Sequence, residues 1–384
     1  MRVIFIYIDV GSGFSGQVAA TRLIAERLQQ DGVNVVRCLM PYFDRSVTAH
    51  KWRCALTFLQ RLLCAYFRLL LTSIRLGGAL HLSLGLTRFA LVRDGLALFC
   101  ASLFNRHPLR CVVALNGSVF TEWLTDSLNA RLFRWIISRA DVVTCVGELH
   151  RDALINLGVP SKKIEVVPNV CEYDGIEESD VAEKQVSSDQ PLECLFLSSL
   201  TDTKGYPEYL EAFEMIGSVD GAPIHAVLCG PIMMDAYRKR FETYDKAKVW
   251  IEQKVASINE SDRVQVEWIP GARGSEKREL YERAQIFVLP TQYTVEAQPL
   301  AVIEAMAHGC AIVTSDVGEL LSTVNDESAI VLSAPTPDSV KQAIVSLAED
   351  EQLRMSLGQA ALNQFKTKFN RERYLRHWSE LLGL

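Results

Sequence analysis

Short apolar runs separated by longer mixed segments recur along the whole chain. Runs of this kind, without strict alternation of polar residues, are typical of parallel strands that are buried on both faces. Their alternation with helix-like segments predicts an α/β protein built from strand–helix units. The predicted strands are residues 1–9, 33–39, 80–84, 111–115, 141–146, 194–197, 226–229, 264–268, 286–289 and 311–314.

The most informative pattern lies in residues 291–324, directly after one of these apolar runs. Pro299 occurs where the first turn of a helix would begin, a position that needs no amide partner. Apolar residues at helical spacing follow as far as Gly309, which marks the end of the helix. Glu296 in the loop and Glu304 in the helix therefore flank a helix N-terminus. Its free amides suit a phosphate, and the carboxylates can accept hydrogen bonds from hydroxyls beside it.

Glu296 and Glu304, with seven residues between them, are followed by Ala305-Met306-Ala307, Gly309 and the run 314–318. This arrangement resembles the Glu-x7-Glu donor site of retaining glycosyltransferases, above all glycosyltransferase family 4 with the GT-B fold. The resemblance implies an α/β protein with two doubly wound Rossmann-like domains facing a cleft, and ligands at the carboxyl ends of the strands. It also implies transfer of a sugar from a nucleotide-sugar donor to a hydroxyl, with retention at the anomeric carbon.

The resemblance also assigns roles around this helix. Glu296 would hold hydroxyls of the donor sugar, and Glu304 would hold the ribose. The helix N-terminal amides after Glu296, with Gln298, Leu300 and Ala301, would contact the donor. Positioning and electrostatic stabilisation would then carry the reaction, and neither glutamate is expected to act as a nucleophile.

Two positions concern the leaving diphosphate. The resembled family usually has Gly-Arg where this chain has Ser198-Ser199, and a lysine near Lys204. Lys204 is retained and would stabilise the diphosphate. Ser199 can donate a hydrogen bond but carries no charge. The phosphate clamp is therefore weaker, or another cation such as Arg273 replaces the arginine.

Three further positions follow from the resemblance. Gly16 ends the glycine-rich string 11–16 before a predicted helix and would border the donor phosphates. Ile269 would lie beside the nucleobase. Asn116 stands where the family has a histidine that faces the donor sugar, and asparagine can bind a hydroxyl but cannot titrate. A dinucleotide site at the glycine string is disfavoured, because no acidic residue ends the second predicted strand.

Changes in composition predict the domain boundaries. Residues 1–170 and 191–370 are expected to form two domains. The resemblance implies that the first is the acceptor-side domain and the second the nucleotide-sugar donor domain. The segment 171–190 is acidic, has few large apolar residues and shows no helical period, which predicts a linker or a surface excursion. Apolar residues at helical spacing in 371–384 predict a C-terminal helix that, as in GT-B proteins, completes the first domain.

The two halves differ in charge. Residues 1–170 have a net charge of +9 and the remainder −15. A basic first half suggests contact with an anionic membrane surface or a phosphate-bearing acceptor. Arg61, Arg68 and Arg75 recur along segment 50–80 with leucines and aromatics opposite them. No uncharged run there is long enough to cross a bilayer, so the segment is either a packed surface helix or a helix in a membrane interface.

The remaining composition limits the partners. The ten cysteines are scattered without metal-ligand spacing, which predicts reduced thiols in the cytoplasm. No Asp-x-Asp follows a predicted strand, so no metal and no other cofactor is expected. The expected partners are a nucleoside-diphosphate sugar and a carbohydrate or lipid-linked saccharide acceptor, not a nucleic acid. Peripheral attachment to the inner face of the membrane would bring the chain to such an acceptor during polysaccharide, lipopolysaccharide or capsule synthesis.

Two alternatives remain open. Nucleotide-sugar 2-epimerases share the fold, although they usually lack the Ala-Met-Ala frame after the second glutamate. A non-catalytic sugar-nucleotide-binding subunit of a polysaccharide assembly complex would account for Asn116 and Ser199. Turnover of a nucleotide sugar, as opposed to binding alone, distinguishes these alternatives from a transferase.

Overall fold

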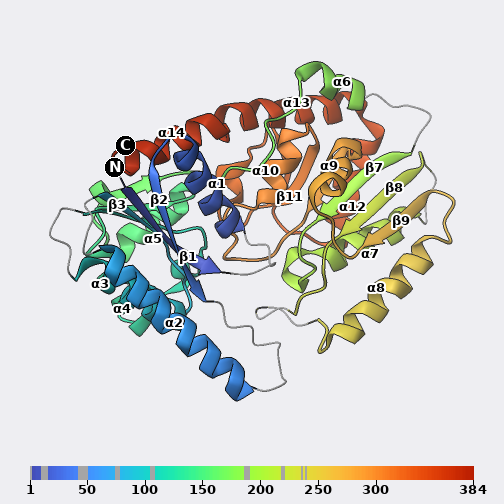
Figure 1. The fold of residues 1–384 in the computed structure, drawn as a ribbon. Helices are drawn as coiled ribbons and strands as arrows, with labels where there is room; N and C mark the ends of the chain where they lie inside the picture. The colour runs from blue at the N-terminus through green and yellow to red at the C-terminus, as the bar shows by residue number, and fades with distance from the viewer. Residues whose placement is uncertain are drawn as a thin grey trace. The chain divides into compact units, whose positions relative to one another are not determined.

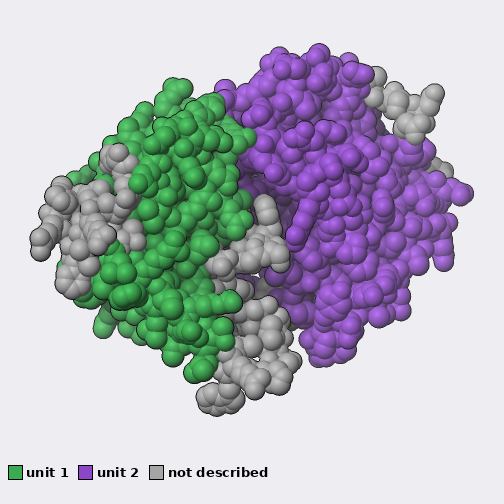
Figure 2. All heavy atoms as spheres, in the orientation of Figure 1, with its two compact units in different colours: residues 1–169, 371–384 green, residues 170–370 purple. Residues whose placement is uncertain are grey.

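The computed structural model divides the chain into two compact units, Met1–Asn169 with Arg371–Leu384 and Val170–Asn370 (Figure 1, Figure 2). Each unit has a sheet of six parallel strands with helices packed against it. These sheets confirm the predicted fold class of two doubly wound α/β domains. The structure describes residues 2–9, 16–41, 51–73, 78–103, 109–185, 191–217, 221–234, 237 and 240–384.

The sheet of the first unit is formed by β1 (Arg2–Asp9), β2 (Asn34–Pro41), β3 (Gly78–Ser83), β4 (Leu109–Ala114), β5 (Val142–Cys145) and β6 (Ile164–Val166). Its strand order is β2-β1-β3-β4-β5-β6. Alternate residues of a strand face opposite sides of the sheet, as β1 shows. Ile4 and Ile6 belong to one core cluster, whereas Val3 and Phe5 belong to another. The strands are mostly apolar because both faces are covered.

The helices of the first unit are α1 (Gly16–Gln30), α2 (Lys51–Ser73), α3 (Arg88–Ser102), α4 (Leu128–Ile137), α5 (Glu148–Asn156) and α14 (Arg371–Leu381). Short 3-10 helices occur at Val119–Glu122 and Ser161–Lys163. One core cluster joins the sheet to α2, α3, α4 and α5, and the other joins it to α1 and α14. The two groups of helices therefore cover opposite faces of the sheet.

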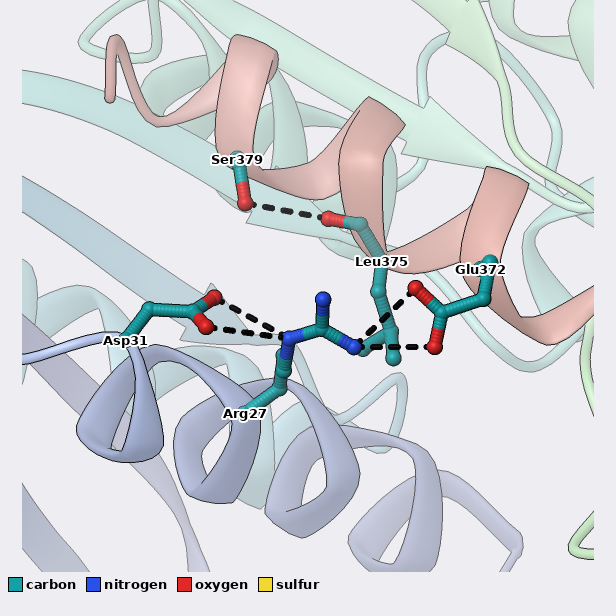
Figure 3. A network of polar contacts seen from close by, with 5 residues as sticks. All are labelled: Arg27, Asp31, Glu372, Leu375 and Ser379. Atoms are coloured by element: carbon teal, nitrogen blue, oxygen red, sulfur yellow. Dashed lines mark hydrogen bonds and ion pairs between the residues drawn. The ribbon is translucent and has the colours of Figure 1, made fainter.

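The C-terminal helix α14 packs into the first unit. Leu375 and Trp378 are buried in the same core cluster as residues of α1. Arg27 of α1 lies between Asp31 and Glu372, with 2.9 Å between its Nη1 and a carboxylate oxygen of Glu372 (Figure 3). The last residues of the chain thus complete the unit that contains the first ones.

The sheet of the second unit is formed by β7 (Leu192–Leu197), β8 (Ile224–Cys229), β9 (Val264–Ile269), β10 (Ile286–Leu289), β11 (Ala311–Ser315) and β12 (Ala329–Leu332). Its strand order is β12-β11-β10-β7-β8-β9. The order reverses between the neighbours β7 and β10, so the connections after these two strands leave in opposite directions. In open α/β sheets, ligands bind outside the carboxyl ends of the strands at such a switch point.

The helices of the second unit are α6 (Glu178–Gln185), α7 (Tyr206–Gly217), α8 (Tyr244–Ile258), α9 (Gly274–Arg283), α10 (Leu300–Ala307), α11 (Leu320–Thr323), α12 (Pro337–Glu349) and α13 (Glu351–Lys368). A 3-10 helix at Asp202–Lys204 precedes α7. A single large core cluster includes residues of β7, β10, α10 and α13. No helix in the described part of the chain has the length and hydropathy of a bilayer span.

The acidic segment 171–190 differs from the predicted linker. Its described part, as far as Gln185, belongs to the second unit, and Val181 of α6 is completely buried there. Tyr173 is also buried in the core of this unit, and polar side chains add hydrogen bonds. Lys184 Nζ donates to the carbonyl oxygen of His308 at 2.8 Å, and Gln185 Nε2 donates to that of Gly309 at 2.9 Å. The acidic composition therefore did not indicate that this part of the chain packs into the second unit.

The segment between β4 and β5 does not form one continuous helix. A short 3-10 helix is followed by a turn, and α4 begins only at Leu128. Ser127 caps α4 by accepting a hydrogen bond from the amide of Ala130. Serine favours this position because its side chain satisfies an amide that has no partner within the helix.

Candidate functional site

The switch point of the second sheet brings together two residues predicted to belong to the site. Lys204 follows β7, and Glu296 lies in the loop after β10. Their side chains form an ion pair in which the lysine is 16% exposed and the glutamate 7%. Breaking a buried ion pair by removing one partner costs about 3–5 kcal/mol, because the other charge stays buried. The two loops are therefore coupled through this contact.

The backbone on the lysine side requires a glycine. Gly205 has a φ of +82°, and a Cβ atom there would lie 2.2 Å from the carbonyl oxygen of Pro290. The loop is further tied to the β10 side by two hydrogen bonds to the carbonyl oxygen of Thr203. The amide of Gln292 donates at 2.6 Å and the hydroxyl of Thr291 at 3.2 Å. Lys204 is thus fixed against the end of β10.

The backbone of Glu296 is fixed by a second glycine. Gly318 has a φ of +53°, and a Cβ atom there would lie 2.1 Å from the carbonyl oxygen of Glu296. That oxygen accepts a hydrogen bond from the amide of Glu319 at 3.1 Å. The side chain of Glu296 also accepts from the hydroxyl of Thr291 at 3.3 Å. The glycine of the 314–318 run therefore allows the close approach that positions the carboxylate.

Helix α10 begins beside this pair. Pro299 is the N-cap residue of α10, whereas the sequence had predicted it in the first turn. No side chain caps this end of the helix. The amides of Leu300 and Ala301 precede the first intrahelical donors, because the carbonyl oxygen of Pro299 accepts from residues 302 and 303. Gln298 is buried just before the helix. The N-terminus of α10 thus has the free amides and the positive end of the helix dipole, which suit an anionic group.

Glu304 lies inside α10, is 5% exposed and has two donors on α9. Lys277 Nζ lies 2.7 Å from one carboxylate oxygen, and the hydroxyl of Tyr281 donates to the other at 2.9 Å. Lys277 also lies 3.1 Å from Glu172. A carboxylate has about four acceptor positions, so two protein donors leave capacity for a ligand hydroxyl.

Burial and the lysine act in opposite directions on this carboxyl. Burial raises the pKa of Glu304, and the charge of Lys277 offsets only part of that rise. Burial lowers the pKa of Lys277, but attraction to Glu304 and their hydrogen bond outweigh it, so the net shift is upward. The sequence analysis did not identify Lys277 and Tyr281. Their spacing of four residues on one helix was the only signal, and it occurs on many helices.

The other predicted residues of the second unit lie at strand ends. Ser199 is half-buried in the loop after β7, and its carbonyl oxygen accepts from the amide of Thr201 at 2.9 Å. Ile269 is the last residue of β9 and is half-buried. Arg273 is exposed directly before α9. That Arg273 takes the role of the arginine usual in the resembled family stays a prediction.

Two predicted residues belong to the first unit. Asn116 is half-buried in the loop after β4, and Gly16 is the first residue of α1. Residues 10–15, with the other glycines of the string, lie outside the described residues. The sequence analysis missed His150, whose Nε2 lies 2.8 Å from Ser118 Oγ below the Asn116 turn. Burial lowers the pKa of His150 to about 4, which keeps its ring neutral near pH 7.

Two family models match the chain, one in each half. Residues 178–364 match Glycosyl transferases group 1, and residues 14–173 match Glycosyltransferase Family 4. Together they cover most of both units. A glycosyltransferase signature on two doubly wound domains defines the class of protein. The chain belongs to the GT-B glycosyltransferases.

Solved structures share this fold at low sequence identity. HepE from Anabaena, crystallised with UDP-glucose, matches with a TM-score of 0.68 and 16% identity over 99% of each chain. Sucrose-phosphate synthase from Thermosynechococcus elongatus matches with a TM-score of 0.65 and 17% identity over 98% of each chain. The lipopolysaccharide outer core galactosyltransferase WaaB matches with a TM-score of 0.62 and 12% identity, over 100% of this chain and 99% of its own. No curated protein sequence has significant similarity to the chain.

Proposed function

We propose that this glycosyltransferase moves a sugar from a nucleoside-diphosphate sugar to a hydroxyl acceptor, with retention at the anomeric carbon. The Lys204–Glu296 ion pair carries the proposal, because it lies at the switch point of the second sheet in the loops next to α10. A cation beside a helix N-terminus suits a diphosphate, and the paired carboxylate suits sugar hydroxyls. The crystallisation of HepE with UDP-glucose supports this class of donor.

The proposed reaction depends on stabilising the leaving diphosphate, which gains negative charge as its bond to the sugar breaks. Lys204 and the amides of Leu300 and Ala301 stabilise that charge, most strongly in the transition state. Glu296 accepts hydrogen bonds from sugar hydroxyls and orients the ring. The acceptor hydroxyl attacks from the face that the diphosphate leaves and gives its proton to the departing phosphate oxygen. Attack from this face retains the configuration. Because Lys204 and the helix amides supply the positive field, the scheme needs no metal or other cofactor.

The remaining donor contacts are assigned by position. Glu304 uses its spare acceptor capacity for the ribose hydroxyls, and its protein donors Lys277 and Tyr281 hold it in place. Ser199 donates a hydrogen bond to the diphosphate, and Ile269 lies against the base. Gln298, buried before α10, contacts the donor sugar.

The first unit takes the acceptor in this proposal. Asn116 binds a hydroxyl of the transferred sugar, and Gly16 allows backbone to approach the phosphates. The donor sugar is a hexose, and the acceptor is a carbohydrate or lipid-linked saccharide of a surface polysaccharide or lipopolysaccharide. HepE was crystallised with UDP-glucose, which supports a hexose donor. WaaB is a lipopolysaccharide outer core galactosyltransferase, which supports a saccharide acceptor of this kind.

A donor panel tests the proposal. The full chain is incubated with UDP-, GDP- and ADP-hexoses, and thermal unfolding and nucleoside-diphosphate release are measured. We expect sugars of one base to raise the unfolding temperature, because a bound donor stabilises the folded state by mass action. Glu304→Gln should weaken donor binding about 10–100-fold, since a buried hydrogen-bond acceptor is lost. Glu276→Gln, an exposed change on α9, is the matched control.

Product analysis decides between this proposal and its alternatives. Nuclear magnetic resonance of the product should show transfer with the anomeric configuration retained. Inversion at the sugar C2 without transfer would identify an epimerase. Binding without release of nucleoside diphosphate under any acceptor condition would identify a non-catalytic subunit, which the uncharged Ser199 and Asn116 favour. Either result would overturn the proposed function.

A further inference from the structure

Two neighbouring helices of the first unit expose stripes of large apolar side chains. The members recur every three or four residues, so each helix presents one continuous stripe. Each of these side chains is at least 40% exposed, with Leu56 at 72% and Phe67 at 62%. The stripe of α2 is Leu56, Leu59, Leu63, Phe67 and Leu71, and that of α3 and its cap is Phe89, Val92, Leu96, Phe99 and Leu103.

The stripes form one surface because α2 and α3 are packed together (Figure 1). The rings of Phe58 and Phe89 lie 5.8 Å apart, and the hydroxyl of Tyr66 donates to the carbonyl oxygen of Arg93 at 3.0 Å. Both helices cover the same face of the sheet, so their exposed sides point away from it. Large contiguous apolar surfaces usually mark an interaction site. We call the two stripes the apolar face.

The charges around the apolar face are almost all positive. Residues 45–121 contain ten lysines and arginines but a single acidic residue, Asp94. Asp94 is buried and paired with Arg93 at 2.7 Å. The exposed charged residues among the described side chains of α2 and α3 are Arg61, Arg68 and Arg88. Cationic groups therefore flank the apolar face, and the described side chains of α2 and α3 include no exposed carboxylate.

A groove of about 440 Å³ between β2 and α2 borders the apolar face. Arg37, Arg61 and Arg68 line it, and no acidic side chain does. Three guanidinium groups beside one groove suit a phosphate, which arginine can bind through two parallel hydrogen bonds. The other lining residues are Cys38, Leu39, Thr57, Gln60, Cys64 and Ala65.

We propose that the apolar face docks on the surface of an anionic lipid bilayer, with a lipid phosphate in the arginine groove. The leucines and phenylalanines enter the boundary between head groups and acyl chains, and the arginines contact the anionic head groups. Charge selects this occupant, because a second copy docking face to face would place two positive surfaces together. The proposal does not rest on the donor site, since all of its residues belong to the first unit.

Vesicle co-sedimentation of the full chain tests the proposal. Vesicles of phosphatidylcholine alone are compared with vesicles of equal parts phosphatidylcholine and phosphatidylglycerol, at low and high salt. We expect binding to the phosphatidylglycerol vesicles that weakens with salt, because exposed charges are screened. Equal binding to both vesicles, or binding insensitive to salt, would overturn the proposal.

Two pairs of substitutions separate the charged and apolar contributions. Arg61→Gln with Arg68→Gln should weaken partitioning about thirtyfold, equivalent to about 1 kcal/mol for each arginine near an anionic surface. Leu63→Gln with Phe67→Gln should abolish sedimentation. The matched controls are Arg373→Gln with Arg376→Gln on α14, across the sheet, and Leu321→Gln with Met355→Gln in the second unit. The exposed positions should leave thermal unfolding unchanged. If the two control variants lose vesicle binding while the Arg61/Arg68 and Leu63/Phe67 variants keep it, the assignment of the docking surface to α2 and α3 is contradicted.

Two further measurements distinguish other occupants. Inorganic phosphate that stabilises the parent but not the Arg61/Arg68 variant, without vesicle binding, would show a site for free phosphate and not for a lipid. A larger species in solution that the Leu63/Phe67 changes convert to a monomer, again without vesicle binding, would assign the face to a second copy. Both outcomes would overturn membrane docking.

Discussion

Lys204 and Glu296 form a buried ion pair whose members act on different parts of the proposed donor. Lys204 would stabilise the diphosphate, whereas Glu296 would orient the sugar. The lysine is therefore important for structure and chemistry at once, because its removal also leaves the Glu296 charge without its partner. Experiments on this residue must separate the two effects.

Lys204→Ala should lower kcat about 10²–10³-fold with a smaller change in KM, as removal of a group that stabilises transition-state charge does. The variant should also lose stability, and Lys204→Ala with Glu296→Gln should recover part of that stability without recovering kcat. Steady-state kinetics and denaturant unfolding measure the two effects. A variant with raised KM and unchanged kcat would remove Lys204 from the chemistry.

The position of the Glu296 loop depends on a neighbouring element, the tight turn after β11. Gly318 has a positive φ and lies against the backbone of Glu296. Both features exclude a side chain. Gly32 offers a useful comparison, since its φ of +81° is similarly left-handed. Among the described residues, no atom beyond its chain neighbours lies within 4 Å of a Cβ placed there.

Gly318→Ala should displace Glu296 and reduce donor affinity and turnover by about tenfold or more, since misplaced catalytic groups are costly. Gly32→Ala should cost only about 1–2 kcal/mol of stability, the penalty for a left-handed backbone with a Cβ, and leave activity unchanged. Calorimetric titration of the donor and thermal unfolding of both variants provide the comparison. Equal activity in both variants would show that the contact with Glu296 is unimportant.

Helix α14 meets the sheet of the first unit through a buried histidine. His81 lies between Phe5 and Trp378, with ring centroids 4.9 Å from each. Complete burial lowers the pKa of His81 to about 3. Because the unfolded chain binds the proton more readily, His81 contributes stability that is present above about pH 6.5 and is lost as the pH falls toward 3.

His81→Phe should therefore reduce the loss of stability between neutral pH and pH 5 by about 2 kcal/mol. Denaturant unfolding across this range measures the effect. His225→Gln should act in the opposite direction, because a hydrogen bond with Glu193 raises the pKa of His225. An unchanged pH profile in His81→Phe would mean that the ring is hydrated or already charged.

At the scale of the whole molecule, the sequence predicts the described strands except β6 and β12, together with the Glu296–Glu304 spacing. Buried parallel strands are continuous apolar runs, and the Glu296–Glu304 spacing, with its proline and glycine, is local. The missed features depend on tertiary contacts. Helix α3 was not predicted because its exposed and buried sides are both apolar, which hides the helical period. The Lys277–Glu304 pair joins two helices and has no local signature.

The first and last parts of the chain share one unit, which makes the stability of that unit depend on the C-terminus. Leu375, Trp378, Leu381 and Leu382 are all buried against the first sheet or α1. Burial of a large apolar side chain contributes about 1.5–3 kcal/mol. The exposed Arg27–Glu372 pair contributes little by comparison, because water and salt screen it (Figure 3).

Truncation after Asn370 should destabilise the first unit by roughly 6 kcal/mol or more, from four lost apolar contacts, and leave the second unit folded. Calorimetry and limited proteolysis should then show early loss of the first unit, with residues 170–370 protected. Donor-induced stabilisation of that protected unit should persist in part, because Lys204, Glu296 and Glu304 all lie within it. Arg27→Ala is the control and should leave the unfolding profile nearly unchanged. If truncation unfolds both units together, their stabilities are coupled and the C-terminal helix serves the whole chain.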